Sequence, residues 1–149
     1  MLSLRRDAYD EIIDRGYAGD DEEVCGVLAG ERAPDDAGDG APDGHVTAVF
    51  PATNVADAPQ VRYAMDPEEQ LALIDRLEAQ GLDLVGFYHS HPAGPPRPSQ
   101  TDADRARWPG YSYVICAFDG RPYLGSWRWT GSEFERERVA VLSGERSGE

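Results

Sequence analysis

Lysine is absent from this sequence of 149 residues: all 14 basic residues are arginines, against 28 acidic residues and a formal net charge of −14. Nucleic acid is therefore not expected as a partner, because phosphate binding needs a basic surface. An acidic surface without lysine is typical of proteins that work at high cytoplasmic salt, where repulsion between carboxylates is screened. A GC-rich genome, which favours arginine, alanine and glycine codons, is the alternative explanation. In either case the N-terminus is the only amine available for an isopeptide linkage.

Long apolar runs and cysteines are also scarce. No run approaches the roughly 18 apolar residues of a membrane-spanning helix, and the first residues lack the apolar core of a signal peptide. The sequence therefore predicts no membrane association. Cys25 and Cys116 both lie in apolar segments, which favours buried, reduced thiols and a cytoplasmic protein, with a disulfide between them as the alternative.

A chain of this length most simply forms one domain, which we place at residues 1–142, with 143–149 as a frayed C-terminal tail. Periodicity and turn residues predict helices at 3–17, 67–80 and 101–108, and strands at 24–30, 45–51, 82–91, 111–118, 122–129 and 134–142. A flexible loop is expected at 31–44 and irregular chain at 54–63. This order of elements indicates a mixed α/β domain with a largely antiparallel sheet flanked by helices.

The helix at 67–80 has the clearest signals. Asp66 is a predicted N-cap, Glu69 would complete a capping box, and Gly81 would end the helix. Its predicted buried stripe consists of Leu71, Ile74 and Leu77, with Leu73 beside it.

Two histidines, a serine and an aspartate are close together in residues 86–102, GFYHSHPAGPPRPSQTD. Side chains at i and i+2 of a strand point to one face, so His89 and His91 are expected to project together. Their Cα atoms would lie roughly 6.6 Å apart, a span that two imidazoles can close around one metal ion. The proline-rich loop that follows turns the chain, which would allow Asp102 to return as a third ligand. Three protein ligands and one open position are typical of a catalytic zinc site.

The same residues also have simpler explanations. A His-Ser-His sequence by itself is weak evidence for a metal site. Ser99 and Asp102 match a capping box at the start of a helix. A hydroxyl can accept from a helix amide and still donate into a cleft, so capping and catalysis by Ser99 are compatible. His45, at the edge of a predicted strand, is expected to be exposed and to have no ligand role.

A general base is expected near the metal ligands. Glu22 and Glu23 stand at the entrance to the predicted strand at 24–30, which could lie near the strand at 82–91. The alternative is that both glutamates are solvated ends of an acidic loop, as most such pairs are.

The stretch from Glu23 to Gly30, EVCGVLAG, together with His89-Ser-His91, Ser99 and Asp102, closely resembles the JAMM motif of Jab/MPN-domain metalloproteases. The resemblance covers nearly the whole chain. In that family the glutamate stands three residues before the glycine of the strand, which selects Glu23 over Glu22. The resemblance implies a curved, mainly antiparallel sheet between helices, similar to the fold of the cytidine-deaminase-like zinc enzymes.

Members of this family are zinc-dependent peptidases that cleave isopeptide bonds formed by ubiquitin or ubiquitin-like proteins. The resemblance therefore implies one zinc ion per chain held by His89, His91 and Asp102, with Glu23 as general base and Ser99 as donor to the oxyanion. The expected reaction is removal of small ubiquitin-like modifiers from target lysines in a halophilic archaeon, with linear fusions as a second substrate class. The modifier tail, expected to end in diglycine, would bind in a narrow cleft as an added strand. Short loops around the site predict relaxed selectivity next to the scissile bond.

Other functions fit the same features. A peptidase that processes the C-terminus of a sulfur-carrier protein would use the same chemistry, and a non-catalytic scaffold would bind a modifier without cutting it. A zinc nucleobase deaminase would need a Pro-Cys-x-x-Cys sequence, which this chain lacks. The sequence makes no prediction about the oligomeric state.

Overall fold

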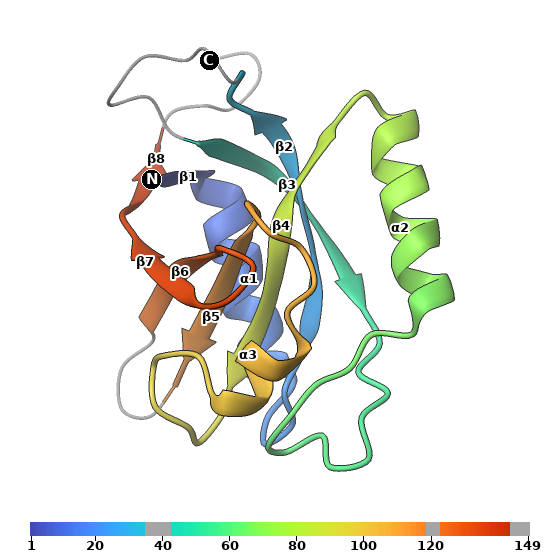
Figure 1. Ribbon diagram of the computed structural model, residues 1–149, viewed down its shortest axis with the longest axis vertical. Coiled ribbons are helices and arrows are strands. Elements are labelled where there is room, and N and C mark those ends of the chain that lie inside the picture. Colours follow the sequence, from blue (N-terminus) through green and yellow to red (C-terminus); the bar gives the residue numbers. More distant parts are fainter. Residues whose placement is uncertain (35–42, 119–122, 144–149) are drawn as a thin grey trace.

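The computed structural model describes residues 1–34, 43–118 and 123–143. These residues form one eight-stranded sheet with helices on both faces (Figure 1). The elements are β1 (Leu2–Arg5), α1 (Arg6–Ala18), β2 (Cys25–Arg32), β3 (Gly44–Ala52), α2 (Pro67–Ala79), β4 (Asp83–His91), α3 (Gln100–Arg105), β5 (Ser112–Ala117), β6 (Tyr123–Trp129), β7 (Phe134–Glu137) and β8 (Val139–Leu142). The strand order is β7-β6-β5-β4-β2-β3-β1-β8, and four of the seven pairings are antiparallel. The predicted α/β class is therefore confirmed.

The sheet is curved so strongly that its two ends approach each other. β7 and β8 lie at opposite ends of the strand order, yet only Arg138 separates them in the chain. The amide of Leu2 in β1 donates to the Arg138 carbonyl, at 2.8 Å. The prediction of one continuous strand at 134–142 was wrong, because β7 pairs with β6 while β8 pairs with β1, and the chain changes partner at Arg138.

The N-terminus begins with a strand, so the prediction of a helix from residue 3 was also wrong. β1 runs parallel to both β3 and β8 and fills the space between them. Leu2 and Leu4 are fully buried in this position. Leucines two residues apart are compatible with a strand as well as with a helix. Here the pairing of residues 2–5 with β3 and β8 makes the segment a strand. The helix α1 starts at Arg6 and buries one side against the sheet, with Ala8, Ile12 and Gly16.

The start and end of α2 are close to the prediction, but its buried side is not. Asp66 accepts from the amide of Glu69 at 3.2 Å, and Gly81 has a φ of +80°, which ends the helix. The Glu69 carboxylate accepts from the Thr53 amide at 3.0 Å and not from the Asp66 amide, so the prediction that Glu69 completes a capping box was wrong. The buried leucines are Leu73 and Leu77, which are four residues apart, whereas Leu71 is 61% exposed and Ile74 half-buried.

Three other predictions concern the connecting segments. The irregular chain at 54–63 is confirmed. Of the loop predicted at 31–44, residues 31–32 belong to β2 and 44 to β3, and residues 35–42 lie outside the described residues. Residues 144–149 of the predicted tail also lie outside them, and the domain boundary at 142 stays a prediction. No helix in the described part of the chain is long and apolar enough to cross a membrane.

The central strand β4 determines where polar side chains can meet. Every residue of β4 except Asp83 is buried. β4 pairs antiparallel with β2, so that Cys25 lies opposite His89. A Cβ atom on Gly26 would lie only 2.4 Å from the Tyr88 ring and 2.5 Å from a carbonyl of β3, so the sheet has room only for glycine there. This register places the residues just before β2 beside the end of β4.

Candidate active site

Two buried histidines form the base of the site at the end of β4. His89 and His91 point to the same side, and their Nε2 atoms lie 3.2 Å apart. The predicted joint projection of the imidazoles is therefore confirmed. Ser90 points the other way, and its hydroxyl accepts from the amide of Val24 at 2.9 Å. This bond ties the residue that follows Glu23 to the strand that carries the histidines.

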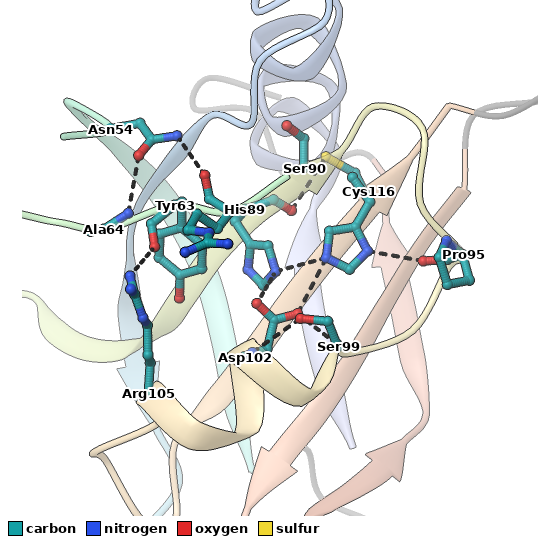
Figure 2. A network of polar contacts seen from close by, with 12 residues as sticks. Asn54, Tyr63, Ala64, His89, Ser90, Pro95, Ser99, Asp102, Arg105 and Cys116 are labelled. Atoms are coloured by element: carbon teal, nitrogen blue, oxygen red, sulfur yellow. Dashed lines mark hydrogen bonds and ion pairs between the residues drawn. The ribbon is translucent and has the colours of Figure 1, made fainter. Parts of the chain in front are cut away.

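Asp102 reaches the imidazoles from the first turn of α3 (Figure 2). The hydroxyl of Ser99 accepts from the Asp102 amide at 3.1 Å, and the Asp102 carboxylate accepts from the Ser99 amide at 2.8 Å, so the predicted capping box is present. The two carboxylate oxygens of Asp102 lie 3.2 Å from the Nε2 atoms of His89 and His91, one oxygen to each. Burial by itself would raise the pKa of Asp102, but the two imidazoles hold it well below its usual range. We call His89, His91 and Asp102 the ligand triad.

Glu23 lies beside the ligand triad and comes from the short segment before β2. Its side chain is buried, whereas Glu22 is exposed. A carboxylate oxygen of Glu23 and one nitrogen each of His89 and His91 lie within 4.8 Å of one another. Burial raises the pKa of Glu23 to about 7, although the nearby His91 works in the opposite direction. Its Oε1 atom is buried and has no hydrogen-bond partner among the described residues. Glu23 is therefore suited to exchange a proton near neutral pH.

The atoms of the ligand triad fit a metal ion. Nδ1 of His91 lies 2.9 Å from the Pro95 carbonyl, which can only accept, so Nδ1 carries the hydrogen and a neutral ring presents its lone pair at Nε2. That lone pair faces the Asp102 carboxylate and the ring of His89. Two acceptors this close repel each other unless a metal cation or a proton lies between them; burial alone would lower the pKa of His91, but the Asp102 carboxylate raises it. A tetrahedral zinc ion, with bonds of about 2.0–2.1 Å, separates its ligand atoms by about 3.3 Å, close to the 3.2 Å seen here.

Tyr63, which the sequence reasoning missed, covers one face of the ligand triad. Its ring stacks on the imidazole of His89, with ring centroids 4.4 Å apart and planes 26° from parallel. Its carbonyl accepts from Arg105 of α3 at 3.2 Å, as Figure 2 shows. Tyr63 therefore links the irregular segment before α2 to both the triad and α3.

Asn54 is a second missed residue and holds Glu23 in place. Its side-chain amide donates to the carbonyl of Glu23 at 2.9 Å. Its side-chain oxygen accepts from the amide of Ala64 at 3.0 Å, as Figure 2 shows. The amide of Glu23 donates to the carbonyl of Pro59 at 2.7 Å. The sequence signal for these roles was slight: an asparagine and a tyrosine in a stretch without helix or strand periodicity.

The remaining histidine and the two cysteines stay outside the cluster. His45 is half-buried and bonds Ser3, at 2.7 Å from its hydroxyl, so the prediction of an exposed side chain was wrong. Cys25 and Cys116 are buried free thiols, as predicted. Burial raises the pKa of each thiol to about 12, so both are protonated at neutral pH.

Comparison with known proteins agrees with this geometry. Residues 5–130 match the family described as prokaryotic homologues of the JAB domain. The chain is 49% identical over 144 residues to a protein of Haloferax volcanii named desampylase, covering 94% of this chain and 96% of that one. It is 32% identical to a CysO-cysteine peptidase of Mycobacterium tuberculosis, covering 95% and 92% of the two chains.

A solved structure shares the fold over almost the same length. The solution structure of a protein from Desulfitobacterium hafniense superposes with a TM-score of 0.82 at 29% identity, covering 96% of this chain and 94% of that one. The chain belongs to the prokaryotic JAB-domain family.

Proposed function

We propose that this chain is a zinc-dependent isopeptidase that releases a ubiquitin-like modifier from a target lysine by hydrolysing the bond at the modifier's C-terminal glycine. The observation that carries the proposal is the convergence of a buried glutamate, whose Oε1 atom has no hydrogen-bond partner in the described part of the chain, on two histidines and an aspartate. The name desampylase of the Haloferax volcanii relative supports it. The acidic, lysine-free composition and the free thiols support a cytoplasmic protein of a halophilic archaeon.

The ligand triad would hold the zinc ion, and each triad member has a partner that fixes its orientation. Pro95 sets the tautomer of His91, Tyr63 stacks on His89, and the Ser99 amide bonds Asp102. Zinc bound there would supply Lewis acidity, which acidifies water to a pKa of about 7 and polarises a carbonyl.

Glu23 would act as the general base and then as the general acid. Its pKa of about 7 allows the carboxylate to accept a proton from water and to return it to the leaving lysine amine. The unpaired Oε1 atom leaves a place for that proton.

Ser99 would stabilise the oxyanion. The oxygen of its hydroxyl accepts from the helix amide, so the hydrogen of the hydroxyl remains to be donated. The side chain is at the start of α3, next to the carboxylate of Asp102. A single donor of this kind contributes about 10²–10³ in rate.

Ser99→Ala is expected to lower kcat by about 10²–10³-fold and the free energy of unfolding by about 1 kcal/mol, because both the oxyanion donor and the helix cap are lost. Steady-state kinetics and thermal melting measure the two effects. Ser99→Gly separates them: glycine costs only a few tenths of a kcal/mol as an N-cap but has no hydroxyl, so it should be nearly as stable as the wild type and as inactive as the alanine variant. Full activity in either variant would leave Ser99 as a cap alone.

Tyr63→Leu is expected to weaken zinc binding about tenfold and to lower kcat more than it changes KM, because the ring that orients His89 is lost. Tyr63→Phe keeps the ring and should restore both values. Zinc affinity is measured by competition with a chelator. Tyr17→Leu is a control, because the ring of Tyr17 packs against the ring of Phe118 and takes no part in the site. Wild-type zinc affinity in Tyr63→Leu would contradict a positioning role.

One assay tests the proposed function against its alternatives. The purified, zinc-loaded chain is incubated with a lysine-linked conjugate of a ubiquitin-like modifier, with a linear fusion and with a sulfur-carrier protein bearing a C-terminal extension. Mass spectrometry then identifies the products. We expect release of the modifier, ending in its C-terminal glycine, from the lysine-linked conjugate. Cleavage of the sulfur-carrier substrate alone would favour a processing peptidase, and modifier binding without any cleavage would favour a scaffold.

A further inference from the structure

A cavity of about 290 Å³ lies between the start of α2 and the segment after α3, next to the ligand triad. Tyr63 forms part of its wall, and the ring of Tyr63 also stacks on His89. One side chain therefore borders both the cavity and the ligand triad. Apolar and basic side chains line much of the remaining wall, among them Met65, Phe87, Trp108, Arg105 and Arg107. We call this space the side cavity.

Contacts within the protein fix the shape of the side cavity. The hydroxyl of Tyr113 accepts from the backbone amides of Arg107 and Trp108, at 3.3 and 3.2 Å. The ring of Phe87 packs against the rings of Trp108 and Tyr113, with centroids 5.6 and 5.4 Å apart. The aromatic wall is therefore in place before a substrate arrives. A preformed concave site lined by aromatic side chains, with polar groups placed among them, is typical of a ligand-binding site.

Two arginines add positive charge to this wall in a chain with a net charge of −14. Arg105 and Arg107 are both exposed, and their guanidinium groups donate to backbone carbonyls. Within the described ranges, no carboxylate lies within 4.0 Å of either guanidinium. These groups attract a carboxylate and repel the ammonium of a lysine. The side cavity therefore suits the modifier side of the scissile bond and not the side of the leaving lysine.

The length of the modifier's C-terminal tail indicates which substrate residue reaches the side cavity. Two extended residues span about 7 Å, and a diglycine has no side chain to fill a cavity. The first side chain that can enter a cavity beside the ligand triad is therefore that of the residue before the diglycine.

Building on the proposed isopeptidase function, we propose that the side cavity selects the modifier. It binds a large apolar side chain directly before the C-terminal diglycine, and Arg105 and Arg107 bind an acidic side chain one residue earlier. Guanidinium and carboxylate groups form charge-assisted hydrogen bonds, which a basic residue at that position would lose. This selectivity is the opposite of the relaxed selectivity that the short loops predict.

Synthetic peptides test this selectivity. The sequences Asp-Leu-Gly-Gly, Asp-Ser-Gly-Gly and Arg-Leu-Gly-Gly are each joined through the last glycine to the ε-amine of a lysine. Dissociation constants are measured with the zinc-loaded Glu23→Gln variant, so that binding is observed separately from cleavage. We expect Asp-Leu to bind about tenfold more tightly than Asp-Ser and about fivefold more tightly than Arg-Leu. The dissociation constants are measured in about 1 M salt, where the Debye length is about 3 Å. Long-range attraction is screened under this condition, so that a charge preference reports close contacts.

Charge reversal in the Glu23→Gln background gives the decisive comparison. Arg107→Glu is expected to reverse the preference, so that Arg-Leu binds more tightly than Asp-Leu. Arg76→Glu makes the same change in net charge on α2, where Arg76 lies over the ring of Phe50 outside the side cavity, and should leave the preference unchanged. Arg105→Glu is a second reversal at the cavity, and thermal melting confirms that each variant folds.

The outcomes separate this inference from the proposed function. A folded Arg107→Glu variant that still prefers Asp-Leu overturns the selectivity, as does equal binding of all three peptides. Cleavage by the wild type would leave the isopeptidase function standing in both cases. Selective binding without any cleavage by the wild type would support the side cavity and contradict the isopeptidase function.

Discussion

Replacing Glu23 by glutamine is expected to lower kcat by about 10²–10⁴-fold while the variant still binds one zinc ion. Glutamine has nearly the same shape as glutamate, but its amide cannot take up a proton from water. The ligand triad does not depend on the Glu23 carboxylate for its geometry, because its orientation comes from Pro95, Ser99 and Tyr63. Cleavage of a lysine-linked modifier conjugate and zinc content by metal analysis measure the two results.

Glu22→Gln is the matched control for this prediction. It removes the same charge one residue earlier, but the Glu22 side chain is exposed, so activity should remain near that of the wild type. The melting temperature of Glu23→Gln should be no lower than that of the wild type, because burying an amide costs less than burying a carboxylate. Normal turnover by Glu23→Gln would end the assignment of the base. Loss of zinc from the variant would make Glu23 a ligand instead.

The part of the site that the sequence predicts directly is the part built from local geometry. Strand alternation places His89 and His91 on one side, and a capping box places Asp102 one helical turn after Ser99. Both rules act over a few residues, so no knowledge of the tertiary fold is needed. The structure brings all of these side chains together as expected.

The position of Glu23 beside the histidines does not follow from local rules. Its place beside the histidines depends on the pairing of β2 with β4, which puts Cys25 opposite His89 across 64 residues of chain. Spacing alone left Glu22 and Glu23 equivalent, and the resemblance to the JAMM motif selected the one that is buried. Tyr63 has no such motif to mark it, because it lies in irregular chain and meets His89 only through the tertiary fold.

The errors in the fold have a similar origin. Leu2 and Leu4 are compatible with a strand or a helix, and only the space between β3 and β8 makes them a strand. The helix α2 has leucines on more than one side, and the side that packs against the sheet carries Leu73 and Leu77 and leaves Leu71 exposed. Where several positions are apolar, periodicity alone does not decide which of them faces the core.

His89→Ala, or treatment of the wild type with a chelator, is expected to remove the bound zinc and all cleavage above background. Bound metal also stabilises the fold: at a zinc concentration 1,000 times the Kd the contribution is about 4 kcal/mol, so chelation should lower the melting temperature by roughly 10 °C. Without the zinc ion, His91 can pair with the Asp102 carboxylate, 3.2 Å from its Nε2 atom, only by taking up a proton. Metal analysis, conjugate cleavage and thermal melting measure the three effects.

His45→Ala provides the control for this experiment, because it makes the same substitution at the chain's third histidine. His45 bonds Ser3 at the β1–β3 pair and takes no part in the ligand triad, so this variant should keep one zinc ion per chain and full activity. Chelation should still lower its melting temperature, whereas it should have little effect on His89→Ala, which has no zinc to lose. Zinc re-addition to the chelated wild type should restore cleavage, since the ligand triad is held by backbone contacts from Pro95 and Ser99 that do not require the metal. A chelated wild type that still cleaves the conjugate, or a His89→Ala variant with one tightly bound zinc ion, would show that these residues do not form the metal centre.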